Sequence, residues 1–76
     1  MSSGNAKFEV KCPMPAKVLE VNVKVGDVVS ADTIVITIES MKMEMPIEAG
    51  ASGTVSAVLA IPSATVPKDE VLIVIN

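Results

Sequence analysis

The residue best suited to covalent chemistry in this 76-residue sequence is Lys42, in the run Glu39-Ser40-Met41-Lys42-Met43-Glu44 near the middle of the chain. Lysine carries a compact amine on a long flexible stem, and it acts as a nucleophile where its surroundings allow. Lys42 is also the only basic residue between Val25 and Pro67. Acylation of this amine would change the formal net charge from −3 to −4 (−3 − 1).

The polarity of the neighbouring residues predicts that Lys42 lies at the tip of a β-hairpin. A two-residue turn at Met41-Lys42 sets Glu39 opposite Glu44 and puts the apolar residues of both strands on the other face. This alternation is the period of two that a half-buried strand requires. The turn lacks the Asn-Gly or Gly-X sequence that such loops favour, and departures of this kind are typical of functional sites.

Segments rich in β-branched residues on both sides of the turn predict an all-β fold without helices. We expect strands over residues 7–11, 18–25, 28–29, 34–38, 43–48, 54–61, about 65–66, and 71–75. Phe8 is the only aromatic residue, so we expect an aliphatic and methionine-rich core. Cys12, the single cysteine, cannot form an internal disulfide, and we expect it to be a small core or edge residue.

The sequence of the first half of the chain resembles that of the second half at a spacing of 37 residues (55 − 18). This spacing aligns Val18 with Val55. Each half would supply about four short strands, and two such half-sheets packed face to face would bury their alternate aliphatic residues. We therefore expect a flattened β-barrel or sandwich of two quasi-symmetric four-stranded halves. The central hairpin would lie at one end and both chain termini at the other. The repeat also aligns Ser63-Ala64 with the Gly26-Asp27 turn.

The composition argues against several classes of function. The sequence has no histidine, no metal-ligand cluster, no phosphate-binding glycine loop and no Ser-His-Asp set, so we expect no catalytic and no metal-binding residues. The six lysines are scattered and lack aromatic neighbours, which argues against nucleic-acid binding. The uncharged run at residues 49–67 contains glycines and prolines, so we expect no membrane span. The lone cysteine suits a reducing compartment, and we expect a cytoplasmic location.

The run Ser40-Met41-Lys42-Met43 resembles the Met-Lys-Met signature of biotinyl domains, the carrier modules of biotin-dependent carboxylases and decarboxylases. Further similar segments are Cys12-Pro13-Met14-Pro15, Val25-Gly26-Asp27-Val28-Val29 and Ser52-Gly53-Thr54-Val55. The resemblance covers roughly residues 10–75. It implies a biotinyl domain over residues 7–76, preceded by a flexible leader of residues 1–6.

By this resemblance, the cofactor is biotin, attached covalently to Lys42, and the chain is a carrier rather than an enzyme. Biotin on Lys42 would carry a carboxyl group between active sites of a biotin-dependent carboxylase or decarboxylase. The implied partners are biotin protein ligase, a biotin carboxylase, and a carboxyltransferase or decarboxylase component. Met41 and Met43 would offer the ligase and these partners a soft, adaptable surface. Met43 has core packing as its alternative, because it shares a face with Met45 and Ile47, which we assign to the core.

Two other interpretations stay open. A lipoyl domain of 2-oxo acid dehydrogenases would have the same barrel, although its lysine usually follows Asp and precedes Ala. An unmodified β-barrel that binds or assembles other proteins would make Lys42 an ordinary solvated residue. The chain departs from the biotinyl pattern at Ala16, where the family usually has glycine, and at Ala31-Asp32, where it usually has Ala-Gly. It also lacks the thumb-like insertion of some members. Alanine disfavours positive φ, so these departures bear on turn strain.

Overall fold

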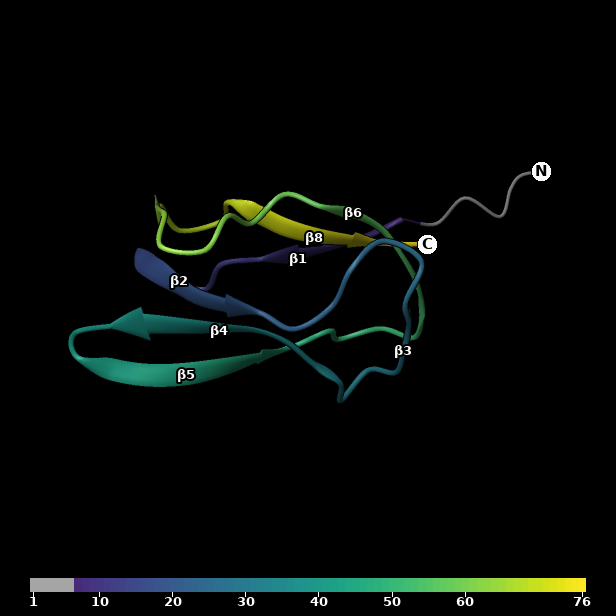
Figure 1. Ribbon diagram of the computed structural model, residues 1–76, viewed down its shortest axis with the longest axis horizontal. Helices are drawn as coiled ribbons and strands as arrows, with labels where there is room; N and C mark the ends of the chain where they lie inside the picture. The colour runs from purple at the N-terminus through teal and green to yellow at the C-terminus, as the bar shows by residue number, and fades with distance from the viewer. Residues whose placement is uncertain (1–6) are drawn as a thin grey trace.

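The computed structural model describes residues 7–76, which form eight β-strands and the turns between them (Figure 1). The strands are β1 (Phe8–Lys11), β2 (Ala16–Val21), β3 (Val28–Val29), β4 (Ile34–Ser40), β5 (Met43–Glu48), β6 (Gly53–Val58), β7 (Thr65–Val66) and β8 (Val71–Ile75). The predicted leader, residues 1–6, lies outside the described residues. Within residues 7–76 there is no helix, and so none that could cross a membrane.

The strands form two four-stranded antiparallel sheets, in the orders β1-β8-β6-β3 and β5-β4-β2-β7. The pairings of one sheet recur in the other with both residue numbers shifted by 37. Val18 pairs with Ile38 in the first case and Val55 pairs with Ile75 in the second (18 + 37 and 38 + 37). The irregularities of register recur at equivalent places as well. The predicted all-β fold of two quasi-symmetric four-stranded halves is therefore confirmed.

The core is aliphatic and lies between the two sheets. A register shift between Ile34 and Ile36 lets consecutive residues of β4, Val35 and Ile36, both be fully buried. Each fully buried aliphatic side chain of this size contributes about 1.5–3 kcal/mol of transfer free energy. Cys12 is also fully buried, so of the two predicted positions, core or edge, it takes the core. The expected methionine-rich core is wrong, because none of the buried core residues in the described chain is a methionine.

Two predicted strands are shorter in the structure than in the sequence-based expectation. β2 ends at Val21 and not at Val25, which is 62% exposed, and β6 ends at Val58 and leaves Leu59 and Ile61 exposed. Past these points the apolar residues look like strand in the sequence but no longer belong to one, although Val23 still packs against the core and Ala60 is buried in it.

The turns that follow are equivalent in the two halves, as the repeat predicted. Gly26 has φ 96° and its N–H donates to the carbonyl of Val55 at 2.8 Å. Ser63, at the matching position, has φ 73° and its N–H donates to the carbonyl of Val18 at 2.7 Å. Serine thus takes up a left-handed conformation that glycine adopts without steric strain. The second turn keeps the geometry of the first without its glycine.

The two departures from the glycine pattern introduce no strain of this kind. Neither Ala16 nor residues 31–32 have positive φ, so ordinary side chains fit their backbone conformations. The position equivalent to Ala16 in the second half is Gly53 (16 + 37). Of these two residues only Gly53 has a positive φ, of 156°. The expected effect of Ala16 and Ala31-Asp32 on turn strain is therefore not found.

The hairpin of β4 and β5 projects from one end of the sandwich, and the C-terminus and the start of β1 lie at the other (Figure 1). Phe8 pairs with Ile75, so the first and last strands are neighbours in one sheet. This arrangement agrees with the predicted positions of the hairpin and the termini. It leaves the hairpin tip far from both ends of the described chain.

Candidate functional site

The candidate site is the two-residue turn that joins β4 to β5. Ser40 pairs with Met43, so Met41 and Lys42 are the turn residues, as the alternation of polarity predicted. Both have left-handed backbone conformations, with φ 54° for Met41 and 66° for Lys42. Positive φ at both central residues is the requirement of a type I′ hairpin turn. For residues other than glycine such conformations cost of order 1–3 kcal/mol each.

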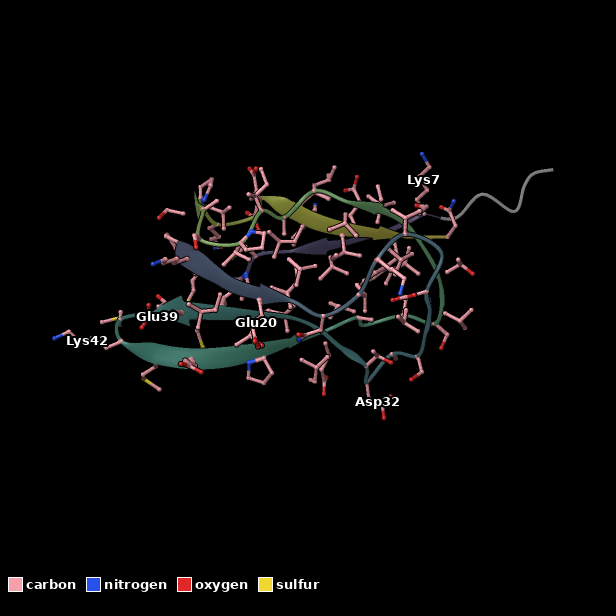
Figure 2. The ribbon with its side chains drawn as sticks, in the orientation of Figure 1. Lys7, Glu20, Asp32, Glu39 and Lys42 are labelled. Atoms are coloured by element: carbon pink, nitrogen blue, oxygen red, sulfur yellow. The ribbon has the colours of Figure 1, made fainter. Side chains whose placement is uncertain are left out.

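This turn holds Lys42 at the extreme end of the molecule, where its side chain is exposed to solvent (Figure 2). The side chain of Lys42 has no hydrogen bond or ion pair with any described residue. The one salt bridge within residues 7–76 joins Lys24 to Asp27. Its amine is therefore unengaged and accessible from several directions. An amine presented in this way can be reached by the active site of another protein.

The methionines beside Lys42 are also in solvent. Met41 is 90% exposed and Met43 is 64% exposed. The alternative that Met43 packs into the core is therefore wrong. Met45 and Ile47, farther down β5, are partly buried and pack against the core, in agreement with their predicted assignment.

A pair of carboxylates lies directly behind the turn. Glu39 is opposite Glu44 on β5 and opposite Lys17 on β2. Asp32, which is near Lys42 only in the sequence, lies toward the other end of the sheet (Figure 2). Of the acidic residues around Lys42 in the sequence, the fold thus brings Glu39 and Glu44 to the hairpin end and leaves Asp32 away from it.

One supporting contact was not predicted from the sequence. The Ser40 hydroxyl donates to the carbonyl oxygen of Pro15 at 3.1 Å and so ties the end of β4 to the segment before β2. That segment is held in turn by Cys12, whose thiol donates to the carbonyl of Met14 at 2.9 Å. Ser40 and Pro15 are 25 residues apart. No local pattern in the sequence connects them, so only the folded arrangement could reveal the contact.

The tip offers an accessible nucleophile and no enclosed space. The hollow between β1 and β5 is lined by residues such as Phe8, Pro13 and Ile47, and none of its lining residues belongs to the turn. Among residues 7–76 no group of three or more His, Cys, Asp or Glu side chains could hold a metal ion. The geometry thus suits presentation of a covalently attached group, and the exposed Lys42 amine fits that role.

A comparison with family models matches residues 8–75 to the family described as "Biotin-requiring enzyme". Among curated proteins, the biotin carboxyl carrier protein of Streptococcus mutans serotype c is 40% identical over 74 residues. The match covers 97% of this chain and 57% of that relative, so the chain spans little more than half of the relative's length.

Solved structures show the same fold in two kinds of protein. The urea carboxylase of Kluyveromyces lactis matches with a TM-score of 0.87 and 28% identity, over 100% of this chain and 7% of that one. The lipoyl domain of the 2-oxoglutarate dehydrogenase complex from Azotobacter vinelandii matches with a TM-score of 0.70 and 25% identity. That match covers 83% of this chain and 80% of the lipoyl domain.

Proposed function

Because this chain belongs to the family of biotin-requiring enzymes, as a carboxyl carrier domain, we propose that Lys42 is the residue to which biotin is attached. The observation that carries the proposal is the exposed, unengaged amine of Lys42 on a hairpin tip, between two exposed methionines. The domain presents its cofactor and performs no bond chemistry of its own. We also propose that residues 7–76 are the extent of this domain.

Each residue of the tip has a separate part in this function. The Lys42 amine forms an amide with the carboxyl group of biotin, and its flexible stem lets the attached group move. Biotin, when bound, supplies the ring that takes up and releases a carboxyl group. Met41 and Met43 offer apolar, adaptable contacts on either side of the amide. The contact between Ser40 and Pro15 holds the tip end of β4 against the segment that precedes β2.

The partners follow from this chemistry. A biotin protein ligase would acylate Lys42, and a biotin carboxylase and a carboxyltransferase or decarboxylase component would then receive the hairpin tip in turn. The names of the similar proteins, a biotin carboxyl carrier protein and a urea carboxylase, support this choice. We place the domain in the cytoplasm, since its single cysteine is buried and forms no disulfide.

The test is co-expression of the chain with a biotin protein ligase, followed by intact-mass measurement and peptide mapping. We expect one biotin per chain, on Lys42. Lys42→Arg should keep the fold, as seen by circular dichroism, and take up no biotin, because arginine has no acylatable amine at neutral pH. Lys68→Arg, at another exposed lysine, is the matched control and should be biotinylated normally. Streptavidin binding by Lys42→Arg would show that the assignment is wrong.

The second candidate function is lipoyl attachment at the same lysine, which the structural similarity to the lipoyl domain favours. Supplying a lipoyl ligase in place of the biotin ligase separates the two. A lipoyl adduct on Lys42 without any biotin adduct would move the chain to the dehydrogenase group. The absence of both adducts would make Lys42 an ordinary solvated lysine.

A further inference from the structure

We propose that the thioethers of Met41 and Met43 form a reversible oxidation site, with a peroxide as oxidant, and that their oxidation slows the acylation of Lys42. The effect on Lys42 rests on the proposed function. The oxidation itself rests only on the exposure and surroundings of the two methionines.

The methionines of the described chain differ sharply in accessibility. Met41 is 90% exposed and Met43 is 64% exposed, whereas Met14 and Met45 are partly buried. Met45 lies two residues from Met43 on the same strand and packs against the core. Oxidation of a methionine follows the access of the oxidant to its sulfur. Met45 is therefore an internal reference for the reactivity of the two tip methionines.

The exposure of the tip methionines is built into the hairpin. Met41 has a left-handed backbone in the turn, and Met43 pairs with Ser40, the last residue of β4. Neither methionine belongs to the core cluster or packs against it. Because no neighbouring apolar surface covers these side chains, folding gains little from them and does not protect their sulfur atoms.

The chemical step is a two-electron oxidation of a thioether. The methionine sulfur attacks one oxygen of the peroxide, a sulfur–oxygen bond forms, and the oxygen–oxygen bond breaks. Sulfur is oxidised to the sulfoxide, and with hydrogen peroxide the other oxygen leaves as water. The change is reversible, because methionine sulfoxide reductases return each sulfoxide epimer to the thioether.

The sulfoxide changes the surface that Lys42 presents. It replaces a soft apolar group with a polar and chiral one, while the net charge stays the same. Oxidation at both positions would convert the apolar surface on either side of the amine into a polar one. Since those side chains have no role in the core, the fold and its stability should remain while recognition of the tip declines.

The experiment uses the untagged apo chain, treated with hydrogen peroxide and sampled over time by peptide mapping. We expect Met41 and Met43 to gain one oxygen each about fivefold or more faster than Met45. The peroxide is then removed, biotin and biotin protein ligase are supplied, and kcat/KM for biotinylation is compared with that of untreated protein. We expect a fall of about fivefold or more, with recovery after treatment with both types of methionine sulfoxide reductase.

Two variants assign the effect to the tip. In the double variant Met41→Leu, Met43→Leu the ratio of treated to untreated rates should be about one, whatever the untreated rate is, because no oxidisable sulfur remains there. Met45→Leu should retain the full loss on treatment. Equal oxidation rates for Met45 and the tip methionines, or an unchanged kcat/KM after tip oxidation, would overturn the proposal. Absence of biotinylation in untreated protein would instead overturn the assignment of Lys42 as the attachment site. The proposed effect of methionine oxidation on Lys42 would then fall with it.

Discussion

Glu39 and Glu44 lie directly opposite each other on β4 and β5, next to the pair that closes the Met41-Lys42 turn. Lys17 lies on the other side of Glu39, but no salt bridge joins the two within residues 7–76. Like charges placed opposite each other in a sheet are destabilising. The end of the hairpin thus combines charge repulsion with a strained turn, at the place where the proposed attachment site lies.

Removing one of these charges should stabilise the domain. Glu44→Gln is expected to raise the free energy of unfolding by a few tenths of a kcal/mol up to about 1 kcal/mol, because the cross-strand repulsion disappears. Urea unfolding followed by circular dichroism measures the change. Glu48→Gln is the control, since Glu48 pairs with the uncharged Ile34 and should show no comparable gain. Equal gains from both variants would contradict the prediction.

Replacing the turn with a favourable sequence should separate stability from function. The double variant Met41→Asn, Lys42→Gly is expected to raise the free energy of unfolding by about 1–2 kcal/mol, because Asn-Gly adopts the type I′ turn readily. The same variant should take up no biotin. Thermal unfolding and streptavidin blotting provide the two measurements.

Ser63→Gly serves as the matched change, because it relieves a positive φ in a turn away from the hairpin. It should also stabilise the domain, by about 1 kcal/mol, and leave biotin uptake intact. A loss of stability in the Asn-Gly variant would mean that the methionine and lysine side chains support the turn in a way that their exposure does not indicate.

The two methionines of β5 should differ in their contribution to stability. Met43→Leu keeps the side-chain volume at an exposed site and should change the free energy of unfolding by less than about 0.5 kcal/mol. Met45→Ala removes partly buried contacts and should lower it by about 1–2 kcal/mol, less than at a fully buried position. Chemical denaturation of both variants tests the contrast. A large loss for Met43→Leu would mean that Met43 packs into the core.

Gly53 should tolerate no side chain. A Cβ atom there would collide with the main-chain oxygen of Asn76 and lie 2.8 Å from Cγ2 of Ile75. Gly53→Ala is therefore expected to lower the free energy of unfolding by about 1–3 kcal/mol. Gly26→Ala is the comparison: its Cβ would meet no atom within 4 Å, so only its positive φ opposes the change, by about 1 kcal/mol. Equal losses from the two variants would show that the collision at Gly53 is relieved by movement of the chain end.

The fold and the tip could be predicted because both depend on patterns that the sequence displays directly. Alternation around Lys42 sets the hairpin register, and the 37-residue repeat gives the two matching sheets. The strand ends beyond Val21 and Val58 could not be found in this way, because apolar residues continue past the last pairing. The contact between Ser40 and Pro15 depends on long-range packing, which a sequence pattern does not encode.

The matched pairings give the domain a cyclic topology that its chain ends interrupt. Phe8 and Ile75 occupy the places that Met45 and Ile38 hold in the hairpin (45 − 37 and 38 + 37). Residues 1–6 could be replaced by a link of the same length as the segment Ser40 to Met43, joining Asn76 to Lys7. This link would close the chain into a ring with a turn at each end. With Ser-Met-Lys-Met as that link, and new termini opened in an exposed loop, a single domain could carry two attachment lysines at opposite poles.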